Sequence, residues 1–173
     1  PIEADKVAGG GVFVHYDNIS TKSAEVHIDT DVKNSSKQPQ TVTVETTLTD
    51  AEGAIIKRVS GKLTLTPGQS RAISQQITVK NPKFWSPNMP YLYRVESRIK
   101  SGRKNVDGGV TRIGIRKAEF RGKDGFWLNN QPFGQLVGTN RHQDFAYVGN
   151  AVPNSQPVRD AKRLRDAGCT IIR

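Results

Sequence analysis

The sequence predicts a mainly β protein, in which a β-sandwich is followed by a short strand–helix–strand unit. From Val12 to about Lys117, apolar and polar residues alternate with a period of two, the pattern of strands with one buried and one solvated face. Turn-forming residues interrupt this alternation roughly every 8–12 residues. After Lys117 the alternation ends, and a single helical pattern appears between two short apolar runs.

The first region resolves into roughly seven short strands, which is typical of an immunoglobulin-like sandwich. Its inward-facing residues are expected to be Ala24, Val26, Ile28, Val32, Val42, Val44, Leu48, Leu63, Leu65, Ile73, Ile77, Val79, Tyr91, Tyr93, Val95, Ile99, Thr111, Ile113 and Ile115. Turns are expected at residues 34–37, 50–53, 67–69, 87–90 and 101–102. One cysteine, Cys169, excludes an internal disulfide, so this sandwich must be stable without one.

The second region is expected to form a βαβ unit. In chain order the patterns predict a hairpin over 120–133, a buried strand over 133–139, a polar loop over 140–156, a helix over 156–168 and a strand over 169–172. Asn129 and Asn130 suit a tight turn with positive φ, Pro157 suits a first helical turn, and Gly168 suits a helix end. Two parallel strands and one helix cannot cover both faces of a sheet. We therefore expect an incomplete second domain that exposes apolar residues such as Leu136 and Ile171.

Composition excludes several classes of function. The net charge of +10 is spread along the chain, with 18 Lys+Arg against 11 Asp+Glu in residues 1–118 and 8 against 5 in residues 119–173. Without a clustered basic patch or aromatic platform we expect no nucleic-acid partner. No apolar run is long enough to span a membrane. Residues 1–17 lack a secretory signal, but a mature chain could have lost one, so periplasmic, secreted and cytoplasmic locations stay open.

No metal or cofactor site is expected. The single cysteine excludes a thiolate metal cluster. We interpret His15 and His27 as surface residues of strands. His142 lies in a different setting, in the segment GTNRHQDF (138–145), where an amide, a guanidinium, an imidazole and a carboxylate follow an apolar run.

Five segments, in order and over most of the chain, resemble motifs of glycoside hydrolase family 2, the family of β-galactosidases, β-glucuronidases and β-mannosidases. They are NPKFWSP with PYLY (81–87 and 90–93), GIR (114–116), FWLNNQP (126–132), GTNRH (138–142) and DAKRLRDAGCTIIR (160–173). Asn130 stands where the family pattern has glycine, and Thr170 where asparagine is usual. The resemblance implies that residues 1–118 are an immunoglobulin-like sandwich and that residues 119–173 are the N-terminal part of a truncated (β/α)8 barrel, also called a TIM barrel.

The resemblance also assigns roles to the polar segment. Barrel enzymes build their sites from residues at the carboxyl ends of strands. By the family pattern, His142 lines the sugar pocket, Asp144 contacts sugar hydroxyls and Arg173 supports the site, while Asn140 and Arg141 have a structural or supporting role. Three plainer interpretations stay open: His142 could cap or tether the loop, Asp144 could accept hydrogen bonds from its own backbone, and Arg173 could be a frayed terminus.

The implied function is that of a retaining β-glycosidase, specifically a β-galactosidase, acting on carbohydrate without a cofactor. Retention requires two carboxyl groups about 5–5.5 Å apart. After the sandwich only Asp144 is well placed, and we expect Asp160 and Asp166 to lie on the helix, away from the strand ends. The family's two catalytic glutamates come from later strands, so we expect the 173-residue chain to be inactive. The alternatives are a non-catalytic carbohydrate-binding or adhesive module and, from charge, a nucleic-acid binder.

Overall fold

The computed structural model describes residues 2–4 and 11–173 and confirms a mainly β protein. The chain divides into two compact units, Pro1–Lys117 and Ala118–Arg173. Over the described residues there is one α-helix, and it lies in the second unit. No helix of the described residues is long and apolar enough to cross a bilayer.

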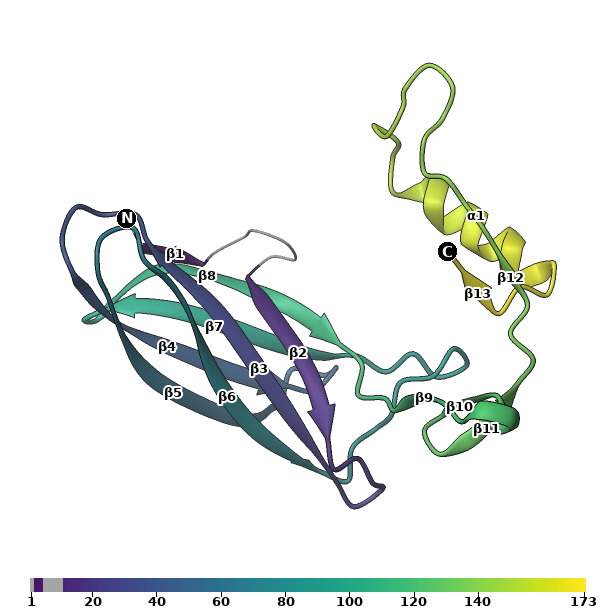
Figure 1. Ribbon diagram of the computed structural model, residues 1–173, viewed down its shortest axis with the longest axis horizontal. Helices are drawn as coiled ribbons and strands as arrows, with labels where there is room; N and C mark the ends of the chain where they lie inside the picture. Colours follow the sequence, from purple (N-terminus) through teal and green to yellow (C-terminus); the bar gives the residue numbers. More distant parts are fainter. Residues whose placement is uncertain (1, 5–10) are drawn as a thin grey trace. The chain divides into compact units, whose positions relative to one another are not determined.

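The first unit is a β-sandwich of two antiparallel sheets (Figure 1). In one sheet, β3 pairs with β6 along one edge and with β1 and β2 along the other; in the second, the order is β5-β4-β7-β8. The strands are β1 (Ile2–Ala4), β2 (Val12–Asp17), β3 (Ser23–Asn34), β4 (Gln40–Thr49), β5 (Ile55–Leu65), β6 (Ser70–Lys80), β7 (Tyr93–Ser101) and β8 (Lys104–Ile113).

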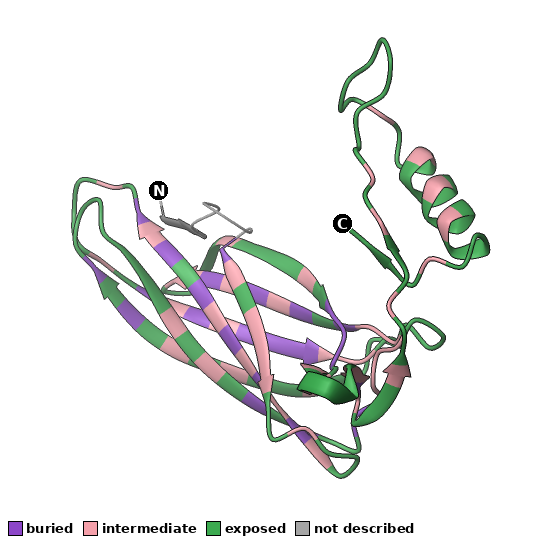
Figure 2. Ribbon diagram, turned by 45° about the vertical axis from the view of Figure 1, so that its right-hand side comes forward, coloured by how far each residue is buried: buried purple, intermediate pink, exposed green. Residues whose placement is uncertain are grey.

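The alternation of apolar residues corresponds to the buried faces of these strands. Figure 2 shows buried and less buried positions alternating along β3, where Val26 and Ile28 are fully buried. Nearly all of the predicted inward positions are buried, including Ile77 and Val79 in β6. The exceptions are Ile73, Tyr91 and Thr111, which are half-buried. Each strand thus contributes one apolar face to the core between the sheets, and burial of that surface is the main stabilising term of the unit.

The buried side chain of Asn34 has hydrogen-bond partners for both its amide nitrogen and its amide oxygen. The Asn34 side-chain amide donates to the carbonyl oxygens of Gln38, Leu65 and Thr66 at 2.9, 3.1 and 3.2 Å. Its Oδ1 accepts hydrogen bonds from the backbone N–H and hydroxyl of Ser36 at 3.0 and 2.7 Å. Asn34 is fully buried, so these bonds offset the cost of removing its amide from water. It fixes the turn after β3 to the turn after β5.

The second unit begins with a three-stranded antiparallel sheet in the order β11-β10-β9. Its elements are β9 (Ala118–Phe120), the 3-10 helix η1 (Gly122–Asp124), β10 (Phe126–Leu128) and β11 (Gln131–Gly134). Asn129 and Asn130 form the two-residue turn between β10 and β11, with φ of 53° and 63°. This confirms the predicted tight turn, and it explains why asparagine can stand where the family pattern has glycine, since asparagine tolerates the left-handed region.

The rest of the second unit is a βαβ unit. It consists of β12 (Gly138–Thr139), α1 (Ser155–Asp166) and β13 (Ile171–Ile172), and the two strands pair in parallel (Figure 1). The expected helix, with Pro157 in its first turn and Gly168 in a left-handed conformation after its end, is confirmed.

Both expected strands of the βαβ unit are shorter and more exposed than the sequence suggested. Only residues 138–139 and 171–172 pair, and Val137, Ile171 and Ile172 remain 47, 47 and 44 % exposed. The prediction of a buried strand over 133–139 is therefore wrong in extent and in burial, while the expected exposure of Ile171 is confirmed. One helix and two strands leave apolar surface uncovered, which also limits how far the ladder extends.

Candidate functional site

The carboxyl ends of β12 and β13 lie at the same edge of their two-stranded sheet. Gly138 pairs with Ile171 and Thr139 with Ile172, and the chains approach closely there: a Cβ atom added to Gly138 would lie 2.7 Å from Ile171 Cγ2. The Thr170 hydroxyl accepts a hydrogen bond from the Val137 N–H at 2.9 Å. This combination of a small residue and side-chain bonding sets the spacing of the two strands.

Arg141 and Arg173 meet at this edge through their backbones. The Arg173 N–H donates to the Thr139 carbonyl at 3.0 Å, and the Arg141 N–H donates to the Arg173 carbonyl at 3.1 Å. The parallel ladder therefore continues by one residue beyond the assigned strands. It also fixes the backbone on either side of Asn140, directly where the polar segment leaves β12.

The Arg141 side chain is held by the helix. Its Nε and Nη2 donate to Asp160 Oδ2 at 3.0 and 2.6 Å, and Gln156 Nε2 donates to the other carboxylate oxygen at 3.2 Å. The hydrogen bond from Arg141, with a weaker contribution from its charge and from Gln156 and Arg159, holds the pKa of the Asp160 carboxyl below its ordinary value. The pair thus ties the start of the polar loop to the first half of α1.

Asp160 is a correction to the sequence expectation. We expected it on the helix and away from the strand ends; it is on the helix, but its carboxylate binds Arg141, which lies two positions after the end of β12. The long guanidinium side chain bridges the distance. Sequence reasoning missed this pairing, and the only signal for it was the presence of two opposite charges in segments expected to be joined by one loop.

His142 and Asp144 lie further along the loop and are exposed. Asp144 directly precedes Phe145, which forms an isolated antiparallel bridge with Gly149. Within residues 11–173, no hydrogen bond or ion pair links either side chain to Arg141 or Arg173. The structure therefore brings Asn140, Arg141 and Arg173 to one edge and leaves His142 and Asp144 beside it on the loop, with their side chains accessible to a ligand.

A second group of polar side chains lies in the sandwich and was not anticipated. His15 and His27 occupy directly opposed positions of β2 and β3, with ring centroids 4.8 Å apart, and Asp17 Oδ2 lies 3.3 Å from His27 Nε2. Both histidines are half-buried rather than simple surface residues. The sequence could place His15 and Asp17 on one face of a strand, but the register that aligns them with His27 was not readable from it.

The chain thus combines an antiparallel β-sandwich with a βαβ unit whose polar residues follow the strand ends. The family model described as glycosyl hydrolases family 2 matches residues 10–116, which span strands β2 to β8. The chain therefore belongs to glycosyl hydrolase family 2. This match confirms the resemblance to the family, and the segments at 81–93 and 114–116 lie within the matched residues.

Relatives extend the similarity across both units. The chain is 29 % identical over 171 residues to a β-glucuronidase of Formosa agariphila, covering 98 % of this chain and 17 % of that protein. It is 30 % identical over 167 residues to the β-galactosidase BoGH2A of Bacteroides ovatus, covering 96 % and 20 %. A solved structure of Bacteroides uniformis β-glucuronidase 2, covalently bound to cyclophellitol-6-carboxylate aziridine, superposes with a TM-score of 0.85 at 27 % identity, covering 99 % and 21 %. The chain thus spans about a fifth of the length of these proteins.

Proposed function

We propose that this chain is part of a retaining β-glycosidase, with residues 1–118 as an immunoglobulin-like domain and residues 119–173 as the first part of a (β/α)8 catalytic barrel. The observation that carries the proposal is the parallel pairing of β12 with β13 around α1. A (β/α)8 barrel is built by repeating this unit, and its active site forms at the carboxyl ends of the strands. Membership of a glycoside hydrolase family supports the same assignment.

In this proposal His142, Asp144 and Arg173 contact the sugar. They follow the carboxyl ends of β12 and β13, and the side chains of His142 and Asp144 are exposed there. Hydrogen bonds to charged groups contribute about 1.5–3 kcal/mol each, so a few such contacts can hold and orient a monosaccharide. Arg141 has a supporting role, because its guanidinium is engaged by Asp160 and its backbone by Arg173. Asn140 lies between Thr139 and Arg141 at the same edge, and we assign it a supporting role as well.

The two catalytic carboxyl groups are proposed to come from parts of the protein outside this chain. In the second unit Glu119, Asp160 and Asp166 are each paired with an arginine on a neighbouring element or residue. The hydrogen bond from Arg141 lowers the pKa of Asp160, whereas a general acid needs a raised pKa. Asp144 alone cannot supply the two carboxyl groups of a retaining mechanism. We therefore expect the 173-residue chain to have no hydrolytic activity.

Two substrate classes are candidates. A β-galactoside is our first proposal, and the similarity to the Bacteroides ovatus β-galactosidase supports it. A β-glucuronide is the second, favoured by the names of the Formosa and Bacteroides uniformis relatives. The two sugars differ in the configuration of the C4 hydroxyl and at C6, where a glucuronide carries a carboxylate that a cationic partner in the pocket would bind.

Nitrophenyl β-galactoside and β-glucuronide turnover by the full-length protein tests the proposal. We expect one of them to be hydrolysed with the β-anomer as the first product by NMR, and no turnover by residues 1–173 alone. His142→Ala and Asp144→Asn should lower kcat/KM by at least ten-fold in the full-length enzyme, whereas Gln143→Ala, between them on the exposed loop, should change it by less than two-fold. Release of the α-anomer first, full activity of residues 1–173, or equal effects of all three variants would contradict the proposal.

A further inference from the structure

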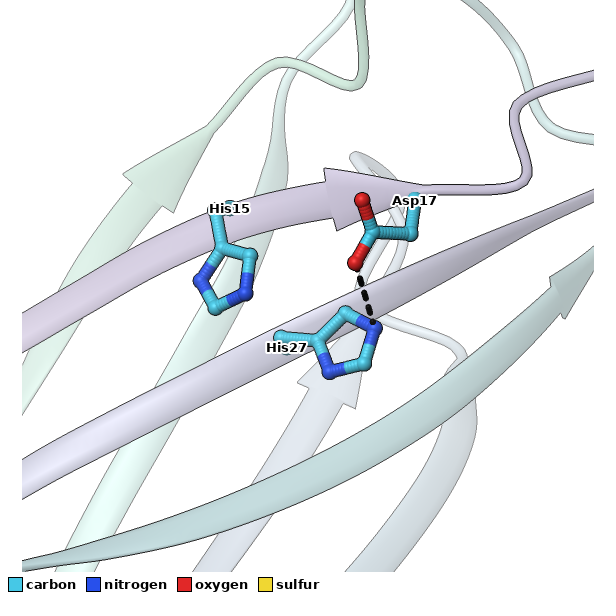
Figure 3. A group of neighbouring side chains, drawn as sticks. All are labelled: His15, Asp17 and His27. Atoms are coloured by element: carbon cyan, nitrogen blue, oxygen red, sulfur yellow. Dashed lines mark ion pairs between the residues drawn. The ribbon is translucent and has the colours of Figure 1, made fainter.

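We propose that His15, Asp17 and His27 form a binding site for a divalent transition-metal ion, with Zn²⁺ as the favoured ion. Figure 3 shows the three side chains gathered on the outer face of the sheet, with Asp17 beside His27. One ligand atom from each residue lies within 4.8 Å of the others. Two imidazoles and one carboxylate are a ligand set that zinc accepts, with a fourth position left for water or another carboxylate. This site is in the sandwich and does not depend on the proposed hydrolase function.

The strand register brings the ligands together. His15 lies directly opposite His27, and Asp17 lies directly opposite Glu25. Side chains alternate along a strand, so residues 15 and 17 of β2 lie on the same face of the sheet as residues 25 and 27 of β3. Directly opposed residues have Cβ atoms about 4.5–5.5 Å apart, close enough for two imidazoles to reach one ion. Glu25 Oε2 lies 3.8 Å from His27 Nε2 and is placed to complete the coordination.

One ligand separation already matches that of a zinc site, and the longest has to shorten. Zinc lies about 2.0–2.2 Å from nitrogen and oxygen ligands, so ligand atoms in a tetrahedral site are roughly 3.3–3.5 Å apart. Asp17 Oδ2 and His27 Nε2 are already 3.3 Å apart. The longest separation in the group must shorten by roughly 1.3–1.5 Å to reach the same geometry. Rotation of the imidazole rings has to supply this change, because the antiparallel ladder fixes the two backbones.

The histidine nitrogens lack hydrogen bonds that would compete with a metal. Over the described part of the chain, His15 Nδ1 and His27 Nε2 are buried from solvent and make no hydrogen bond. The 3.3 Å approach of His27 Nε2 to Asp17 therefore lacks hydrogen-bond geometry. Buried polar atoms of this kind are uncommon in folded proteins and need a partner to offset their desolvation. A coordinated ion would provide one for both imidazoles.

The surrounding charge favours a cation, although the chain as a whole is strongly basic. Along β3 the same face carries Glu25, Asp29 and Asp31 near His27, with Lys33 two positions beyond Asp31. The strand on its other side, β6, places Gln76 opposite His27 and neutral residues opposite Glu25 and Asp29. No lysine or arginine stands directly opposite these carboxylates in the ladders with β2 and β6. The local field therefore attracts a cation.

A metal ion here would join β2 to β3. β2 lies at an edge of its sheet and pairs only with β3 among the described strands. An ion bound by ligands from both strands would hold this edge strand in place, and binding to the folded state alone would raise its stability. The consequence is a zinc-dependent increase in Tm, roughly 5 °C or more at a hundred-fold excess over Kd.

The experiment is a zinc titration of the chain after removal of metal with EDTA, followed by calorimetry, thermal unfolding and Co²⁺ absorption. We expect one Zn²⁺ per chain with a micromolar or lower Kd, and visible Co²⁺ bands of four-coordinate intensity. His15→Gln, His27→Gln and Asp17→Asn should each weaken binding at least ten-fold and abolish the increase in Tm. His142→Gln, which removes the third histidine of the chain, should leave Kd within two-fold of the parent value.

Asp17→Asn is the decisive variant if a histidine variant fails to fold. Asp17 is 60 % exposed, so this near-isosteric change should leave Tm in EDTA unchanged. Binding weaker than millimolar in the parent chain would overturn the proposal. So would unchanged affinity in Asp17→Asn, or a loss of binding in His142→Gln that equals the loss in the sandwich variants.

Discussion

The two units of this chain use the same kind of apolar residue with opposite results. In the sandwich, Ile28 and Leu48 are fully buried between two sheets, whereas Ile171 in β13 remains nearly half exposed. Both regions have strand-forming sequences, but only the sandwich has a second layer to cover each apolar face. The difference shows that the sandwich is stabilised by its own core, while the βαβ unit relies on local turns, one helix and a few specific polar contacts.

Replacement of an isoleucine in each unit should show the largest difference in the free energy of unfolding. Ile28→Ala is expected to lower the free energy of unfolding of the sandwich by about 2–5 kcal/mol, because it removes buried contacts and leaves a cavity. Ile171→Ala, the matched change in the second unit, should alter the same transition by less than about 0.5 kcal/mol. Urea denaturation of the full chain measures both. Equal effects would mean that the second unit also has a core of its own.

Loss of the buried amide should have the next largest effect. Asn34→Ala removes a donor from three backbone carbonyls, of which the Leu65 carbonyl lies in a buried bond, and an unsatisfied buried group costs about 1–3 kcal/mol. Asn105→Ala, at an exposed position of β8, is the control and should change the free energy of unfolding by less than about 0.5 kcal/mol. A similar midpoint for both variants in urea would show that water replaces the Asn34 amide.

In the second unit, the hairpin turn should be the most sensitive backbone position. Asn130 has φ of 63°, and a β-branched residue in that region costs about 1–2 kcal/mol. Asn130→Val should therefore increase amide exchange in β10 and β11, while Asn130→Gly should leave it unchanged or slow it. Sandwich amides report whether the effect stays local. Faster exchange in both variants would instead point to the Asn130 side chain, which accepts a hydrogen bond from Arg121.

The ion pair between Arg141 and Asp160 should give the smallest effect and a pH dependence confined to acid. The pKa of Asp160 is lowered in the folded chain, chiefly by its hydrogen bond from Arg141. The stabilisation is thus fully present above the ordinary pKa of 3.8 and is lost as pH falls through the lower folded value. Asp160→Asn should speed amide exchange at the start of α1 at pH 7 and remove this acid dependence. Exchange in α1 that is equal in both proteins at pH 7 would contradict a stabilising role.

The sequence could predict the sandwich because each of its strands has one wet and one buried face. That alternation identifies Val26 and Ile28 as core residues without any knowledge of which strands pair. In the βαβ unit the presence of two strands was predicted, but their extent and burial were not, because strand length depends on neighbouring layers. The helix was predictable because Pro157 and Gly168 mark its limits locally.

The candidate sites were less accessible to sequence reasoning. Asn140, Arg141 and Arg173 could be placed at strand ends, because parallel strands share their carboxyl edge. The partnership of Arg141 with Asp160, and the gathering of His15 with His27, depend on side-chain reach and strand register, which a single sequence does not encode locally. The sequence pattern therefore does not show which side chains of different elements come into contact.

The close approach of Gly138 to Ile171 has a consequence for how variants of the polar segment are interpreted. Gly138 begins the stretch that contains His142. Glycine is needed there because the Ile171 methyl group on the adjacent strand leaves no room for a side chain. Gly138→Ala would require Ile171 or its strand to shift, so reduced ligand binding by this variant would report on strand spacing. When residues of this stretch are mutated, the pairing of β12 with β13 should therefore be measured before a loss of binding is attributed to a lost ligand contact.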